Sequence, residues 1–234
     1  MRLNKYIAEH GITSRRKADL LVEEGKVKIN GEVMKTLGYE VKEGDKVEVS
    51  GVLLETNVKR TYYMVNKPLG YITSLSDPQG RPVVTELLSD VTERVFPVGR
   101  LDEQTTGLLI MTNDGETSYK MAHPKHEVGK TYEVLVKGFL SRERIRKLEK
   151  GVDIGGYITK PAKVMVVNDK GKDTLINITI TEGKNRQVRK MMKAVGNPVI
   201  ALKRISVGEL KLGRLKEGHY RKLTKEEVEY IKGL

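Results

Sequence analysis

The chain contains no cysteine and no tryptophan, and only two of its 234 residues are phenylalanine. Without cysteine there can be no disulfide, no thiol nucleophile, no iron–sulfur cluster and no Cys-based zinc site. No apolar run approaches the ~18 residues that a membrane-spanning helix needs. The opening residues carry charges where a secretion signal has its apolar stretch. We therefore expect a cytoplasmic protein with no membrane partner.

Positive charge is abundant: 43 Lys and Arg face 31 Asp and Glu, a formal net charge of +12 and a sequence pI of about 9.6. Most of the excess lies after residue 60. Such a balance predicts a polyanionic partner, and nucleic acid is the commonest one.

The patterns change near residue 60, which predicts two domains, residues 1–60 and residues 61–234. In the first, Leu3 and Ile7 lie on one helical face, and Ser14 can cap a second helix that ends near Glu24. Asn30-Gly31 is a strong hairpin signal, because both residues tolerate positive φ. The first domain is thus predicted to be two helices followed by a short sheet.

The second domain mixes helices and strands without regular alternation, which predicts an α+β fold with a mixed, mostly antiparallel sheet flanked by helices. The expected strands are 62–66, 131–136, 162–167 and 174–181. The expected helices are 84–88, 116–122, 141–150, 186–195 and 224–234.

Three cations, Arg15, Arg16 and Lys17, follow the helix cap Ser14, where a helix start favours anions. A bound phosphate would be held there by free backbone N–H groups and by the side chains. The alternative is a solvated run of charge. Further basic residues that would extend the patch are Arg2, Lys5, Lys26 and Lys28.

A second basic cluster runs from Lys184 to Lys193. On a helix, Arg186, Arg189 and Lys190 would share a face. The cluster is either a basic surface helix or a site wall that holds phosphate or pairs with a carboxylate, and the residues alone leave both open.

Asp102 lies in a short polar loop, residues 102–106, between two apolar strands, and functional side chains are often displayed on such loops. The residues alone favour structural roles: a salt bridge for Asp102 and cross-strand packing for Tyr132. His123 and His126 lie near Glu127, but no third clear ligand accompanies them, so we expect no metal site.

Residues 1–49 resemble the S4 RNA-binding domain, which implies binding of structured RNA by shape and backbone contacts. The resemblance is carried by Ser14-Arg15-Arg16, Gly25-Lys26-Val27 and Ile29 before Asn30-Gly31.

The stretch PVGRLDEQTTGLLIMTNDG, residues 97–115, resembles the catalytic signature of the RsuA/RluB/RluF family of ribosomal RNA pseudouridine synthases. Three further blocks match in order and spacing: Asn66-Lys67-Pro68-Leu69-Gly70, Lys130-Thr131-Tyr132-Glu133-Val134, and residues 182–191. With the S4 domain, the resemblance covers nearly the whole chain.

The resemblance implies a role for individual residues. Asp102 matches the catalytic aspartate, Tyr132 the tyrosine that packs against the target base, and Arg189 the arginine paired with the carboxylate. Arg100 matches a residue that enters the space left by the extruded nucleotide. The remaining residues expected to contact RNA are Arg2, Lys5, Arg15, Arg16, Lys17, Lys26, Lys28, Lys184, Arg186 and Lys190.

The function that follows is conversion of one flipped-out uridine of ribosomal RNA to pseudouridine, with no cofactor and no metal. The closing pattern, residues 202–223, is most similar to family members that act on the large subunit, which favours 23S rRNA. The alternatives are a 16S enzyme and a non-catalytic RNA-binding or ribosome-assembly protein. We expect a monomer that acts on ribosomal RNA or a pre-ribosomal particle.

Overall fold

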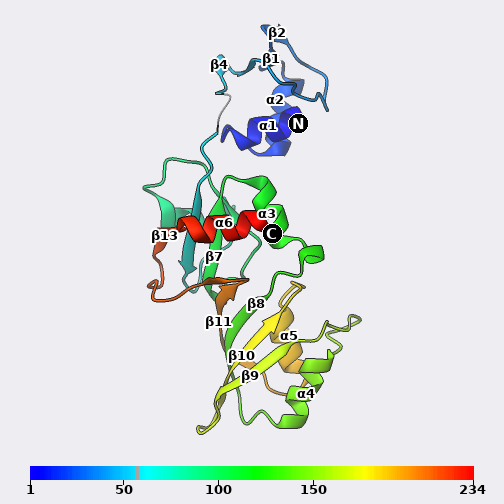
Figure 1. Ribbon diagram of the computed structural model, residues 1–234, viewed down its shortest axis with the longest axis vertical. Helices are drawn as coiled ribbons and strands as arrows, with labels where there is room; N and C mark the ends of the chain where they lie inside the picture. Colours follow the sequence, from blue (N-terminus) through cyan, green and yellow to red (C-terminus); the bar gives the residue numbers. More distant parts are fainter. Residues whose placement is uncertain (56–57) are drawn as a thin grey trace. The chain divides into compact units, whose positions relative to one another are not determined.

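The computed structural model describes residues 1–55 and 58–234 (Figure 1). The chain forms two compact units. The first comprises Met1–Thr61 together with Val91–Val95 and Asn113–Gly115, and the second comprises the remaining residues from Tyr62 to Leu234. Residues 56 and 57, inside the expected domain 1–60, lie outside the described residues. The assignment of RNA binding to residues 1–60 and of catalysis to residues 61–234 stays a prediction.

The first unit has two helices and a four-stranded antiparallel sheet of order β2-β1-β3-β4. Its elements are α1 (Leu3–Glu9), α2 (Arg15–Glu23), β1 (Val27–Ile29), β2 (Glu32–Val33), β3 (Val47–Val49) and β4 (Val52–Leu53). Two helices followed by a short sheet were expected from the sequence, and this part of the prediction is confirmed.

Local chemistry sets where these elements begin and end. The Ser14 hydroxyl accepts a hydrogen bond from the Lys17 N–H at 3.3 Å and so caps α2. Asn30 and Gly31 adopt φ of +53° and +89°, which closes the β1–β2 hairpin. Leu3 and Ile7 are buried in the core of this unit, against the apolar face of the small sheet.

The second unit is built on a nine-stranded mixed sheet, whose main path runs β13-β5-β7-β11-β8-β10-β9. Its strands are β5 (Tyr62–Lys67), β6 (Phe96–Val98), β7 (Thr106–Thr112), β8 (Lys130–Val136), β9 (Lys163–Asn168), β10 (Thr174–Ile180), β11 (Val199–Val207), β12 (Leu210–Lys211) and β13 (Tyr220–Lys222). Its helices are η1 (Val84–Leu88), α3 (Gly115–Ala122), η2 (Pro124–His126), α4 (Arg142–Lys150), α5 (Gln187–Ala194) and α6 (Lys225–Gly233), of which η1 and η2 are 3₁₀ helices. The predicted mixed, mostly antiparallel sheet with flanking helices is confirmed.

The prediction about the basic helix is wrong in one respect. Arg186 has φ +52° and lies before α5, so it does not share a helical face with Arg189 and Lys190. A backbone in the left-handed region cannot continue a right-handed helix.

Strand β11 was not predicted, although it lies at the centre of the sheet. It pairs parallel with β7 and antiparallel with β8, and thereby joins the two halves of the sheet. One of its inward positions is Arg204, which is only 4% exposed. Because a cation stands where an alternating strand has an apolar residue, the sequence pattern does not reveal the strand.

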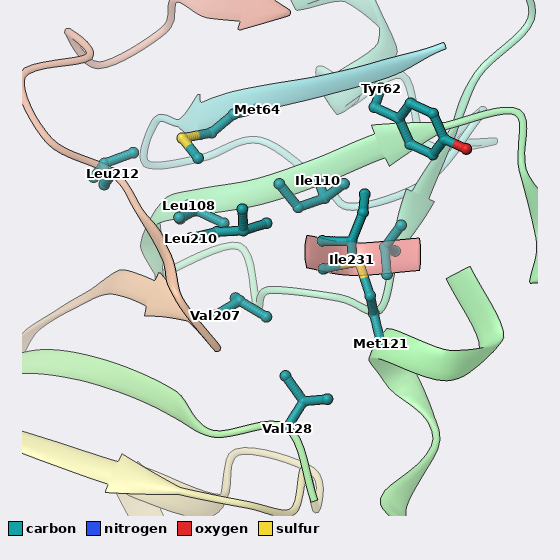
Figure 2. Close-up of a cluster of buried hydrophobic side chains, with 11 residues drawn as sticks. Tyr62, Met64, Leu108, Ile110, Met121, Val128, Val207, Leu210, Leu212 and Ile231 are labelled. Atoms are coloured by element: carbon teal, nitrogen blue, oxygen red, sulfur yellow. The ribbon is translucent and has the colours of Figure 1, made fainter. Parts of the chain in front are cut away.

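Helices α3 and α6 cover the half of the sheet that contains β5 and β7 (Figure 1). Figure 2 shows Met121 of α3 and Ile231 of α6 meeting near Ile110 of β7, and all three side chains are at most 2% exposed. Among the described residues, no helix combines the length and the apolar character that crossing a bilayer requires.

Gly107 allows β7 and β11 to approach closely. It has φ +106°, and a Cβ there would lie 2.2 Å from the Arg204 carbonyl oxygen. We expect Gly107→Ala to lower the free energy of unfolding by about 3 kcal/mol or more, from backbone overlap and an unfavourable φ. Gly138→Ala is the control, with φ +75° and open space around it, and it should cost only about 1 kcal/mol. Urea denaturation measures both, and equal losses would contradict the role of close approach.

Candidate active site

The second unit contains a cavity of ≈ 350 Å³ that brings together several of the residues singled out in the sequence. Asp102 and Tyr132 both line it. The basic residues on its wall are Arg100, Lys130, Lys184, Arg186 and Arg204. Glu182 is the other acidic residue of the lining, so cations predominate around the carboxylate of Asp102.

The loop that carries Asp102 is fixed from both sides. The Thr73 hydroxyl donates to the Leu101 carbonyl at 2.8 Å, and the Leu101 N–H donates back to the same hydroxyl at 3.2 Å. The Asp102 carbonyl accepts from the Thr105 N–H at 3.0 Å, which closes a tight turn just before β7. Asp102 is thus held at the strand entrance with its side chain partly exposed.

Lys67 supports the same loop and was not predicted as a site residue. Its side chain is fully buried, and its ammonium group donates to the carbonyls of Pro68 (2.8 Å) and Glu103 (3.3 Å). Burial lowers the pKa of Lys67 to about 8, although the nearby carboxylates of Glu103, Glu217 and Asp102 act in the opposite direction. A lysine at the end of a mostly apolar strand, directly before Pro68, is the signal that could have identified it.

Tyr132 lies on β8, is 9% exposed, and pairs across the sheet with Arg204 of β11. The guanidinium Nε of Arg204 donates to the Leu108 carbonyl at 2.8 Å, so this buried cation is anchored to β7. Tyr132 is therefore held by the sheet and lines the cavity. A ring in this position can stack on a planar base.

The turn before α5 is held by the buried Glu182. One of its carboxylate oxygens accepts from the Tyr157 hydroxyl at 2.6 Å, and the other accepts from the Gln187 side chain at 2.6 Å. This network fixes the exposed turn that brings Lys184 and Arg186 to the cavity.

Arg189 lies on the first turns of α5, and its guanidinium donates to the Gln104 carbonyl at 2.6 Å. Burial lowers the pKa of Arg189, the positive charge of Arg186 adds to that effect, and the carboxylate of Asp102 opposes it. No ion pair within 4 Å joins Arg189 to Asp102 in the described part of the chain. The expected pairing is thus an electrostatic interaction without direct contact here. Lys190 is exposed and does not line the cavity.

In the first unit, Arg2, Lys5 and Arg15 line one shallow groove of ≈ 300 Å³. Arg16 and Lys17 are exposed at the start of α2. Three of the cations expected to contact RNA have acidic neighbours: Lys26 with Glu24 at 2.7 Å, Lys28 with Glu48 at 3.5 Å, and Lys5 with Glu9 at 3.6 Å. The Lys26–Glu24 pair is exposed and therefore weak, so a phosphate can compete for Lys26, whereas Glu9 beside Lys5 is nearly buried and also pairs with Arg60.

Within residues 1–55 and 58–234, no group of three or more His, Asp or Glu side chains is arranged to hold a metal ion. The cavity instead offers one aromatic ring, several cations and two carboxylates, of which Glu182 already accepts hydrogen bonds from Tyr157 and Gln187. This set suits a planar, anionic substrate that undergoes acid–base or nucleophilic chemistry at a single carboxylate.

Residues 61–194 match the family model described as RNA pseudouridylate synthase, and residues 1–47 match the S4 domain. The chain belongs to the RNA pseudouridylate synthase family. It is an enzyme of the pseudouridine synthase class with an S4 domain, as the resemblance implied.

Relatives match along the whole chain. The ribosomal large subunit pseudouridine synthase B of Bacillus subtilis is 46% identical, over 100% of this chain and 96% of the relative. An uncharacterized RNA pseudouridine synthase of Aquifex aeolicus is 43% identical, over 97% of this chain and 92% of the relative. A crystal structure described as a pseudouridylate synthase superposes with a TM-score of 0.70 at 33% identity and covers 99% of both chains.

The buried ammonium of Lys67 predicts a pH dependence of stability. Its folded pKa is about 8, below the ~10.4 of an unfolded lysine, so between these values the unfolded chain binds the proton that the fold has released. The wild type should therefore gain stability relative to Lys67→Met from pH 8 to 10.4, by at most about 3 kcal/mol. Urea denaturation across this pH range measures the difference. Parallel profiles of the two proteins would show that the ammonium carries no desolvation cost.

Proposed function

We propose that this chain converts one uridine of ribosomal RNA to pseudouridine, with 23S rRNA of the large subunit as its substrate. The proposal is supported by the carboxylate of Asp102 in a cavity beside the ring of Tyr132, surrounded by cations. The name of the Bacillus subtilis relative supports the choice of the large subunit. We further propose that the enzyme acts as a cytoplasmic monomer, without a cofactor or a metal.

The chemistry requires little beyond these groups. The C1′–N1 bond breaks, a C1′–C5 bond forms, C5 loses a proton and N1 gains one, so atoms and electrons balance without a co-reactant. Asp102 is proposed as the group that attacks the sugar or the base, or that removes a sugar proton. Arg189 and the other nearby cations favour the ionised carboxylate that each of these routes needs.

The uridine must leave its stack to reach the cavity, at a cost of a few kcal/mol. We propose that stacking on Tyr132 offsets part of this cost, since base–aromatic stacking contributes ~1–3 kcal/mol. Arg100 is proposed to enter the space that the base leaves, and its exposed position on the cavity wall supports this role.

The first unit is proposed to bind the RNA through Arg2, Lys5, Arg15, Arg16 and Lys17, with additional contacts from Lys26 and Lys28. This proposal is supported by the match to the S4 domain. It is also supported by the exposed cations at the start of α2, where free backbone N–H groups favour phosphate. In the second unit, Lys184, Arg186 and Lys190 are proposed to contact the RNA backbone.

Replacing the carboxylate tests the proposed chemistry. Asp102→Asn should abolish pseudouridine formation, because the amide is neither a base nor a nucleophile, and should leave RNA affinity within a few fold. Pseudouridine is mapped in total rRNA from cells that express each variant or lack the protein. The control is Glu133→Gln, which alters a carboxylate on the next residue after Tyr132, outside the cavity lining.

The outcomes separate the alternatives. The proposal is supported if pseudouridine disappears from a single 23S position both in cells that express Asp102→Asn and in cells that lack the protein. Full turnover by Asp102→Asn refutes the role of Asp102. Loss of a 16S site identifies the small subunit as the substrate, and no lost site in either rRNA refutes ribosomal RNA as the substrate.

The salt dependence of RNA binding tests the role of α2. Replacing Arg15 and Arg16 together by Ala should reduce the slope of log K against log salt by ~0.7–0.9 for each phosphate that the variant no longer binds. The matched control replaces two exposed cations of α4, Lys147 and Lys150, by Ala and should leave the slope unchanged. An unaltered slope in the Arg15/Arg16 variant would place the phosphate-binding residues elsewhere.

A further inference from the structure

Three aromatic rings form a surface cluster where α3 ends and η2 begins. The rings of Tyr119 and His123 lie 4.7 Å apart and are tilted by 37°. The ring of His126 lies 6.2 Å from Tyr119 and 6.5 Å from His123, nearly perpendicular to both. We call Tyr119, His123 and His126 the ring cluster.

The ring cluster is open to a ligand. Tyr119 remains 49% exposed, so a ligand can reach its ring. The Nε2 atom of His126 is buried and has no hydrogen-bond partner within the described chain. Because this atom is buried, a ligand would contact the exposed ring of Tyr119 and not Nε2 of His126.

Positive charge surrounds the rings. The ammonium group of Lys125 lies 5.3 Å from the centre of the Tyr119 ring. Burial lowers the pKa of His126, and the neighbouring Lys125, His123 and Lys120 lower it further. Aromatic rings interleaved with lysines are the composition that binds single-stranded nucleic acid.

The ring cluster also adjoins the cavity that holds Asp102. Ala122 and Pro124, which lie between its members in the sequence, both line that cavity. Met121 lines it as well and anchors α3 in the core. A nucleotide on the rings would therefore lie next to the one whose base enters the cavity.

We propose that the ring cluster, with Lys120 and Lys125, binds a nucleotide that flanks the target uridine, by stacking its base and contacting its phosphate. This inference rests on the proposed function, because it assigns the cluster to the same RNA. In this proposal Tyr119 is a positioning residue. It holds the flanking nucleotide and takes no part in breaking the C1′–N1 bond or forming the C1′–C5 bond. A purely structural role, such as closing the end of α3, would not require an exposed phenol ring.

The test uses the full-length enzyme and an RNA stem-loop that contains the uridine mapped in cells. Tyr119→Leu should raise KM by about 5- to 150-fold, the range expected for removal of one base stack, and leave kcat within about twofold. Tyr119→Phe keeps the ring and should restore KM. Phe139→Leu is the matched control, because Phe139 is 65% exposed and does not line the cavity, and its KM should equal that of the wild type.

A direct readout accompanies the kinetics. 2-Aminopurine is placed in turn at each nucleotide flanking the uridine. The wild type should quench its fluorescence at one position, and Tyr119→Leu should abolish that quenching.

Failure of the inference is distinguishable from failure of the proposed function. If the wild type forms no pseudouridine, the proposed function fails and the inference falls with it. If the wild type is active, the inference is overturned by any of three results: a KM change below about fivefold in Tyr119→Leu, equal impairment of Tyr119→Phe, or an equal effect of Phe139→Leu.

Discussion

The site depends on the close approach of β7 and β11 at Gly107. The missing side chain of Gly107 lets its backbone lie against the backbone of Arg204, so that β11 can enter the centre of the sheet. Asp102 precedes β7, and Tyr132 lies on β8, the strand on the other side of β11. One inserted strand therefore separates the strand that follows Asp102 from the strand that carries Tyr132.

Two charged side chains also fix the loop that carries Asp102. The buried ammonium of Lys67 donates to the loop carbonyl of Glu103, directly after Asp102. The guanidinium of Arg189 donates to the next carbonyl along the loop, that of Gln104. Cations therefore hold the loop by its backbone, and the Asp102 side chain stays partly exposed. Hydrogen bonds from charged donors are stronger than those from neutral ones, so two of them fix this short loop firmly.

Much of this could be predicted from local patterns. Ser14 and the Asn30-Gly31 turn mark element boundaries, because capping and positive φ are properties of neighbouring residues. The central strand β11 could not be predicted, since its inward Arg204 is stabilised by the distant Leu108 carbonyl. Contacts between residues far apart in the sequence leave no periodic signal in either segment.

The sequence by itself determined the class of fold, the family and the residue types available for chemistry, because these depend on composition, spacing and motif. Only the tertiary structure decided which of them meet. It brought Asp102 and Tyr132 to one cavity and left Lys190 outside it. It also set Arg189 on a loop carbonyl within the electrostatic reach of Asp102. The physical reason is that burial and distance arise from packing, which joins residues that the chain keeps far apart.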